Sequence, residues 1–283
     1  MNNEERVEAA KSYLLTQFQN GLCLEFSQLS HGPSLAWTSA CIGSTLAEFK
    51  AAPPETLNAI LKLQWDCGGW SYNQNSVPDS DSTLRVLQFL SKIGFHDQAI
   101  IDRAEKFVIA HQQQDGGIAT YLPVYLEKMG YQAGGWTVSH SCVTALAINV
   151  ITNITAKQKA EKYMSKLLNS GDYHAYWWNT PWYVLYESRR LQAEPISADS
   201  VEMSLVLLLK AKLKIADQKL LNKLASLQKD DGSFPSSHTF RIPRPAQFLS
   251  DISGTEETIS DKNRIFSTAA ACIAINRQKA LVN

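Results

Sequence analysis

The sequence lacks the features that mark several broad classes of protein. Its 27 lysines and arginines balance 27 aspartates and glutamates, and no basic run stands out, so no nucleic-acid partner is expected. No stretch of roughly 18 uninterrupted apolar residues is available for a membrane-spanning helix. The first residues lack the basic start and apolar run of a signal peptide. We therefore expect a cytoplasmic protein with no transmembrane segment, whose association with a membrane is at most peripheral.

Disulfide, zinc-finger and sheet patterns are also missing. The five cysteines are scattered and none forms a C-x-x-C pair, so reduced thiols are expected. No segment alternates apolar and polar residues as a half-buried strand does, so a sheet is not expected. The hydrophobic fraction of 45% is ordinary for a globular chain, and 283 residues are enough to bury a large core.

Helical periodicity is what the sequence has along almost all of its length. Capping residues, glycines and prolines divide it into 11 expected helices. These helices are expected at residues 4–18, 34–49, 55–64, 79–93, 98–113, 139–151, 156–168, 181–191, 197–213, 217–227 and 264–276. The fold class is therefore all-α.

A turn motif recurs after the third, fifth and tenth expected helices. It reads Q-x-x-x-G, then glycine or serine, then an aromatic or apolar residue, and it occupies residues 64–70, 112–118 and 228–234. Its copies begin 48 residues apart (64 to 112) and then 116 residues apart (112 to 228), close to two further periods. Such periods are typical of stacked helix pairs. We expect the glycines to supply a tight turn and the glutamine to bond the loop backbone.

Helix pairs at this spacing either open into a solenoid or close into a ring. Eleven helices, with one further irregular element, suit a ring of six pairs. We predict a single (α/α)6 barrel over residues 1–283, with the second helix of each pair at the centre and the first in the outer wall. The long connection from Ser236 to Lys262 is expected to cover one end of the barrel.

The glutamine–glycine turns resemble the repeat of squalene–hopene cyclases, oxidosqualene cyclases and protein prenyltransferase β-subunits, which share a six-pair α/α barrel. The segment Asp79-Ser80-Asp81-Ser82-Thr83 resembles the D-x-D-D-T motif of class II terpene cyclases. This resemblance implies that Asp81 donates the initiating proton, with Asp79 as its partner, and it places Thr83 among the substrate-binding residues. Ser82 stands where many relatives have a third aspartate. Room for only one barrel makes the chain similar to single-domain class II cyclases that act on prenylated aromatic acids.

Protonating an alkene requires a carboxylic acid that stays neutral until it acts. Burial raises the pKa of an aspartate, and a second carboxylate nearby raises one of the pair further. A helix N-terminus and Arg85, four residues after Asp81, favour the ionised form, so burial must win. His140 is a candidate to hydrogen-bond Asp81 or to accept the final proton. The alternative for His140 is a loop cap.

Carbocations need stabilisation without a nucleophile, which aromatic faces provide. Residues 173–183 are rich in tyrosine and tryptophan, and we expect at least two of them, with Trp178 and Trp182 as the best pair, to face the cavity. Packing between helices is the alternative for each. The candidate substrate-binding aromatics are Trp37, Tyr176, Trp177, Trp178, Trp182 and Phe266.

Arg241 and Arg244, in the long connection, are candidates to bind an anionic headgroup such as a carboxylate. Solvated loop charges are the alternative for both arginines.

Three functions fit these residues. The first is a class II terpene cyclase that cyclises an apolar polyprenyl or prenylated aromatic (meroterpenoid) substrate through carbocations, without a cofactor or metal. The second is a zinc-dependent prenyltransferase β-subunit-like protein, for which Cys142 and His238 are conceivable ligands although no convincing D-x-C segment accompanies them. The third is a non-catalytic toroid that binds a lipid or a partner protein. No D-D-x-x-D segment ends an inner helix, so metal-triggered diphosphate ionisation is not expected.

Overall fold

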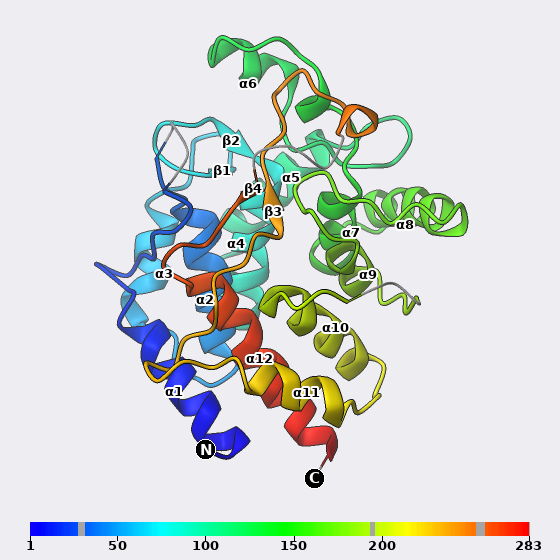
Figure 1. Ribbon diagram of the computed structural model, residues 1–283. Coiled ribbons are helices and arrows are strands. Elements are labelled where there is room, and N and C mark those ends of the chain that lie inside the picture. The colour runs from blue at the N-terminus through cyan, green and yellow to red at the C-terminus, as the bar shows by residue number, and fades with distance from the viewer. Residues whose placement is uncertain (28–31, 193–195, 253–257, 283) are drawn as a thin grey trace.

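The computed structural model describes residues 1–27, 32–192, 196–252 and 258–282 (Figure 1). These residues form 12 α-helices, two short 3₁₀ helices and four two-residue strands. All 11 expected helices are present, within a few residues of their expected ends. The additional helix is α6 (Pro123–Lys128), which sequence reasoning missed because six residues are too few to establish a helical period.

Six helices form a closed inner ring. In chain order each contacts the next, and the last contacts the first, which closes the ring. The inner helices are α2 (Ala36–Ala47), α4 (Ser80–Lys92), α7 (Ser141–Val150), α9 (Trp182–Glu187), α10 (Ser200–Lys212) and α12 (Ile265–Val282). Because neighbours cover both flanks of an inner helix, most of their residues are buried, as the nearly continuous apolar sequence of α10 requires.

Five further helices lie against this ring as an outer layer: α1 (Asn3–Leu15), α3 (Pro54–Leu61), α5 (Gln98–Ala110), α8 (Ile154–Asn169) and α11 (Gln218–Ala225). Each buries one face only; α11, for example, buries Leu221, Leu224 and Ala225. No helix occurs in the described part of the connection between α9 and α10, where the pattern of pairs calls for a sixth outer helix. In the described residues, the inner ring and the outer layer therefore contain 11 helices rather than the 12 of six complete pairs, and α6 lies outside both layers.

The repeated turns are held by the same two side chains in each copy. The glutamine that opens a turn donates to the carbonyl oxygen of the glycine four positions later, in Gln64–Gly68 (2.9 Å), Gln112–Gly116 (3.0 Å) and Gln228–Gly232 (3.0 Å). The backbone N–H of the turn's last residue donates to a threonine on an inner helix, in Trp70–Thr83 (2.9 Å), Ile118–Thr144 (2.8 Å) and Phe234–Thr268 (3.0 Å). The expected role of the glutamine is confirmed, and Thr83 belongs to the repeat.

The glycine that each glutamine binds also brings neighbouring pairs together. Gly68, Gly116 and Gly232 have φ values of 91°, 91° and 84°, and a Cβ on any of them would overlap the backbone of the next outer helix. For Gly232 that helix is α1, whose Ala9 carbonyl oxygen would lie 2.4 Å from the added atom. The last turn therefore packs on the first helix and closes the outer layer.

Short strand pairings occur where the sequence predicted no sheet. β1 (Trp70–Ser71) pairs antiparallel with β2 (Pro78–Asp79), and β3 (Phe240–Arg241) pairs with β4 (Thr258–Ile259). Two residues are too few to show alternation, which is why no sequence pattern marks these strands. The 3₁₀ helices cover Gly135–Thr137 and Leu249–Asp251. The expected connection from Ser236 to Lys262 is irregular apart from these elements, and residues 253–257 lie outside the described residues.

No helix within the described ranges is both long enough and apolar enough to cross a membrane.

Ring closure can be tested by comparing Gly232→Ala with Gly171→Ala. Both glycines have positive φ, but no atom lies within 4 Å of a Cβ placed on Gly171. Each substitution costs about 1–2 kcal/mol for the left-handed backbone. We expect Gly232→Ala to lower the free energy of unfolding by several kcal/mol in urea titration, since its methyl group also meets the backbone of α1. Equal losses in the two variants would contradict the close contact.

Candidate active site

A cavity of about 470 Å³ lies at the end of the barrel where α2 and α4 begin. Its walls come from the first turns of these helices, the β1–β2 hairpin, the segment from 120 to 136, and the two facing stretches 177–178 and 240–245, together with Phe26 and Ile259. Nine lining residues are aromatic: Phe26, Trp37, Tyr72, Tyr121, Tyr131, Trp136, Trp177, Trp178 and Phe240. The cavity is therefore a mainly apolar chamber with few polar groups.

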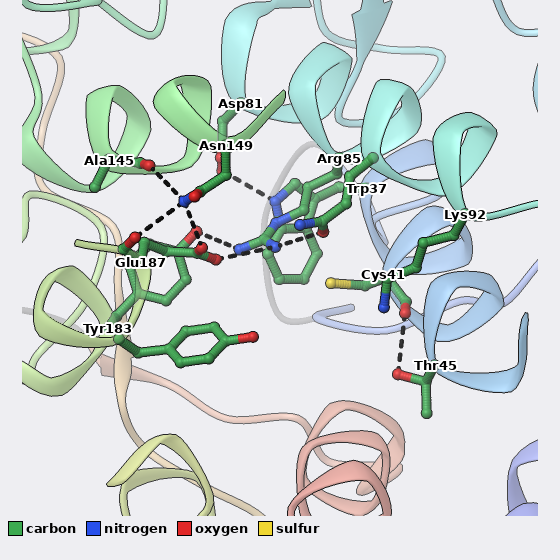
Figure 2. Close-up of polar contacts among 12 residues, drawn as sticks. Trp37, Cys41, Thr45, Asp81, Arg85, Lys92, Ala145, Asn149, Tyr183 and Glu187 are labelled. Carbon is green, nitrogen blue, oxygen red and sulfur yellow. Dashed lines mark hydrogen bonds and ion pairs between the residues drawn. The ribbon is translucent and has the colours of Figure 1, made fainter. Parts of the chain in front are cut away.

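Asp81 is the second residue of α4, and its carboxyl group lines the cavity. Its neighbours Ser80 and Ser82 are buried, whereas Asp81 keeps some accessible surface, which faces the chamber. Trp37 Nε1 donates a hydrogen bond to Asp81 Oδ2 (2.9 Å), which fixes the carboxyl plane (Figure 2). Burial raises the pKa of Asp81, although the nearby Arg85 guanidinium and the Trp37 hydrogen bond lower it.

Asp79 ends β2 and caps α4. Its Oδ1 accepts a hydrogen bond from the backbone N–H of Ser82 (2.7 Å), and its side chain is fully buried beside the cavity. Burial raises the pKa of Asp79 to about 7, the Ser82 hydrogen bond lowers it, and the charge of Asp81 raises it. Both carboxyl groups thus resist ionisation, and burial outweighs the helix N-terminus that favours the charged form.

Arg85 lies one turn after Asp81, but its guanidinium points to other partners. Nη1 donates to Gln88 Oε1 (3.1 Å) and lies 3.8 Å from Glu187 Oε1, and Nη2 donates to the Tyr183 hydroxyl. Its ion pair is therefore with Glu187, on α9, while its charge still favours the ionised form of Asp81, as the i,i+4 spacing predicted.

The expected hydrogen bond from His140 to Asp81 is not formed. His140 Nε2 lies 2.7 Å from the Gly135 carbonyl oxygen and Nδ1 lies 2.7 Å from Thr120 Oγ1, so both ring nitrogens are engaged elsewhere. The ring stacks on Tyr176 with a centroid distance of 4.1 Å. Burial lowers the pKa of His140 to about 4, which keeps the imidazole neutral. Trp177 Nε1, in turn, donates to Thr120 Oγ1 (2.7 Å), so His140 supports the cavity wall from behind.

Thr83 does not line the cavity. Its hydroxyl donates to the Asp79 carbonyl oxygen (2.7 Å) and accepts from Trp70 N–H (2.9 Å), so it fastens the repeat turn below the two aspartates. The expected contact with substrate is therefore corrected to a structural role. Thr144 makes the same pair of bonds, and Thr268 accepts the same bond from the backbone N–H of its turn. The threonine therefore accompanies the turn motif even where no aspartate precedes it, which is the sequence signal for its structural role.

Three of the six expected aromatics line the cavity: Trp37, Trp177 and Trp178. Tyr176, Trp182 and Phe266 do not. Trp178 precedes α9, in an extended stretch that bridges to Phe240, so its four-residue spacing from Trp182 does not place the two rings on one helical face. Phe266 packs behind the wall, 5.5 Å from Trp37 between ring centroids. Tyr176 donates to the Gln247 carbonyl oxygen (2.6 Å).

Six lining aromatics were missed from the sequence: Phe26, Tyr72, Tyr121, Tyr131, Trp136 and Phe240. All lie in loops, a two-residue strand or, for Trp136, a three-residue 3₁₀ helix, where no helical period marks a face. A count of aromatic residues outside the helices is the signal that would have found them.

Both candidate arginines lie at the cavity. Arg241 is buried, and its guanidinium donates to the carbonyl oxygens of Tyr176 (3.0 Å) and Ala175. Arg244 is exposed at the cavity rim, and the described residues place no hydrogen-bond or ion-pair partner on its guanidinium. Arg241 therefore secures the covering loop, and Arg244 is placed to meet the polar end of a ligand.

The described residues contain no group of three His, Cys, Asp or Glu side chains placed to hold a metal ion. The two conceivable zinc ligands differ in environment, since His238 is exposed whereas Cys142 is buried in α7. Burial raises the pKa of the Cys142 thiol to about 11, which disfavours the thiolate that zinc binds.

Comparison with known proteins found relatives only among solved structures. No family model and no curated protein matches the sequence. A protein from Actinoplanes superimposes with a TM-score of 0.83 at 20% identity, over 98% of this chain and 100% of its own. The type II terpene cyclase MstE from Scytonema superimposes with a TM-score of 0.81 at 19% identity, over 99% of both chains.

The chain has the fold of a type II terpene cyclase. A variant of MstE holding its substrate, geranylgeranyl dihydroxybenzoate, superimposes with a TM-score of 0.77 at 20% identity, over 99% of this chain and 97% of its own. Another variant holds merosterolic acid A as product. The single (α/α)6 barrel predicted from the sequence is thereby confirmed.

The raised pKa of Asp79 gives a prediction for stability. The pKa of this carboxyl group is about 4 in the unfolded chain and is raised to about 7 in the folded protein. Its contribution to stability is therefore fully present below pH 4 and is lost as pH rises through 7. The substitution Asp79→Asn would keep the acceptor for Ser82 and remove the titrating group. In urea titrations from pH 4 to 8, we expect wild type to lose stability relative to this variant as pH rises.

Neutral buried histidines contribute equally to both proteins and cancel in this difference. The exposed Asp66, changed to Asn, serves as the control and should show no such trend. A difference between wild type and Asp79→Asn that is independent of pH would contradict the raised pKa.

Proposed function

We propose that this protein is a class II terpene cyclase that starts the cyclisation of a polyprenyl or prenylated aromatic substrate by protonation from Asp81. The observation that carries the proposal is a carboxyl group with a raised pKa, held by Trp37 against an aromatic chamber of about 470 Å³. That volume lies within the range of about 300–1,000 Å³ typical of ligand pockets. A neutral acid beside a hydrocarbon-lined space is the arrangement that alkene protonation needs.

In the proposed reaction the Asp81 O–H bond breaks and its proton adds to the terminal double bond of the substrate. The π electrons form the new C–H bond, and a tertiary carbocation remains. Neighbouring double bonds then attack in sequence, each forming a ring bond and moving the positive charge along the chain. Loss of a proton from carbon ends the cascade with no net change in atoms, and the Asp81 carboxylate regains a proton from solvent.

The chamber walls supply what the migrating charge requires. An aromatic face attracts a cation by about 2 kcal/mol or more when water is excluded, and it offers no lone pair to trap it. Trp37 contacts Asp81, while Trp177 and Trp178 lie on another wall, so aromatic faces flank the path from the acid outward. Asp79 remains a candidate partner of the acid, and His140 supports the wall through Thr120.

The two ends of the cavity suggest how a substrate would lie. Asp81 sits on the inner ring, whereas Arg244 is at the exposed rim. A prenylated aromatic acid would place its hydrocarbon end at Asp81 and its carboxylate at the rim. The substrate of MstE, geranylgeranyl dihydroxybenzoate, is a molecule of this class, which supports the choice of a meroterpenoid substrate.

The acid assignment is tested by Asp81→Asn. Asparagine keeps the acceptor for Trp37 but cannot donate an acidic proton, so cyclisation should fall by about 10³-fold or more. Products from geranylgeranyl dihydroxybenzoate, farnesyl analogues and squalene would be identified by mass spectrometry and NMR. Unchanged melting temperature and substrate binding would show an intact site. Equal turnover by wild type and variant would rule out Asp81 as the acid.

The headgroup assignment is tested by Arg244→Gln. The Michaelis constant for a prenylated aromatic carboxylate should rise roughly tenfold, because a charge-assisted hydrogen bond contributes about 1.5–3 kcal/mol. The matching substrate without its carboxylate serves as control and should be handled equally by both proteins. A similar change for both substrates would contradict headgroup binding by Arg244.

A further inference from the structure

A buried ionic cluster lies beneath Asp81, on the side away from the cavity. Arg85 on α4 and Glu187 on α9 have side chains that are only 7% and 3% exposed, and Arg85 Nη1 lies 3.8 Å from Glu187 Oε1. Figure 2 shows the two side chains directed toward each other between α4 and α9. Two buried charges are costly to keep in a core unless they do something that apolar residues cannot.

Glu187 is held in place from three sides. Asn149 Nδ2 donates to Glu187 Oε2 (3.2 Å) and to its backbone carbonyl (3.0 Å), and Lys212 Nζ lies 3.7 Å from Oε2. Lys212 is the less buried of the two cations, with an exposed side-chain fraction of 18%. Glu187 therefore stands between two positive charges, and Arg85 is the one on the side of the acid.

Arg85 is connected to Asp81 through Trp37. The guanidinium carbon lies 5.5 Å from the centre of the Trp37 ring, within cation–π range, and Trp37 Nε1 donates to Asp81 Oδ2. A tryptophan that is held from below keeps its N–H aimed at the carboxyl group. Arg85 thus supports the orientation of the acid without touching it.

This support has an electrostatic cost. A guanidinium one turn from Asp81 favours the ionised carboxylate, which has no proton to give, whereas the negative charge of Glu187 has the opposite effect. The other titratable groups around the acid are Asp79, whose own pKa the charge of Asp81 raises, and the neutral Cys41, Cys142, Tyr121 and Tyr183, whose own pKa values burial raises. Glu187 is the group that offsets Arg85.

We propose that Glu187 is a positioning residue that neutralises Arg85, so that Arg85 can hold Trp37 in place without drawing the proton from Asp81. The inference rests on the proposed cyclase function and adds to it the reason why Asp81 keeps its proton until it reacts. It assigns the Arg85–Glu187 pair control over the upper pH limit of the reaction.

The first test is the pH profile of cyclisation by Glu187→Gln. The active form carries a proton on Asp81, so activity falls as pH rises through its pKa. Removing the negative charge leaves Arg85 unbalanced, and the upper limit of the profile should move to lower pH by about one unit. Glu105→Gln is the matched control: Glu105 is also buried, but it caps α8 and is not among the groups that act on Asp81. Lower activity with an unmoved limit would reduce Glu187 to a structural role and overturn the inference.

Two further variants keep the test decisive if Glu187→Gln folds poorly. Arg85→Gln combined with Glu187→Gln removes both charges, so its pH limit should rise from that of Glu187→Gln to at least that of wild type, because Arg85 acts on Asp81 more strongly than Glu187 does. The rate constant should fall, because Trp37 loses its support. Lys212→Gln removes a positive charge from the more accessible side of Glu187 and should move the limit to higher pH. A double variant whose limit stays low, or a Lys212 variant with an unchanged limit, counts against the proposal.

The same coupling can be measured without turnover. The infrared absorption of the protonated Asp81 carboxyl, taken as the difference between each protein and its Asp81→Asn counterpart, is titrated from pH 4 to 10 in the pure protein. We expect the midpoint to be lower in Glu187→Gln than in wild type. A lower midpoint in a protein that cyclises none of the substrates would retain the coupling and refute the cyclase function, whereas equal midpoints in an active enzyme would refute the coupling alone.

Discussion

The chemistry proposed for this protein depends on one carboxyl group that resists ionisation beside an apolar chamber. Asp81 begins an α-helix, a place that normally favours a charged carboxylate, and a guanidinium lies one turn away. Burial outweighs both because the ring of inner helices and the loop above it remove the group from bulk water. Trp37 and Glu187 then adjust how firmly Asp81 holds its proton.

The repeat that closes the barrel also places the acid. Trp37, Asp81, Cys142 and Phe266 each lie two residues before a hydroxyl residue, Ser39, Thr83, Thr144 or Thr268, that accepts a hydrogen bond from the backbone of a preceding segment. A hydrogen bond from the preceding segment therefore fixes the first turn of each of these inner helices in the same way. At this shared position, one inner helix carries the tryptophan and the next carries the acid to which it donates a hydrogen bond. The catalytic proposal thus uses an architectural position rather than a separate device.

The chamber and the ionic cluster lie on opposite sides of Asp81 and have different chemistry. Above it, aromatic rings offer polarisable surface to a cation without a lone pair that would end the reaction. Below it, opposite charges are paired inside the protein, among residues that do not line the cavity. Trp37 joins the two regions, since its ring meets Arg85 on one side and its N–H meets the acid on the other.

The sequence alone determined what local physics controls. Helical periods, caps and the glutamine–glycine turns placed all 11 expected helices and implied a closed six-pair ring, and the Asp79–Thr83 segment resembled a known motif that pointed to the proposed acid. Only the tertiary structure decided that Trp178 faces the chamber while Trp182 does not, that His140 bonds Thr120, and that Arg85 pairs with Glu187. Helix periods and caps act within about four residues, whereas these contacts join irregular segments that ring closure brings together from distant parts of the chain.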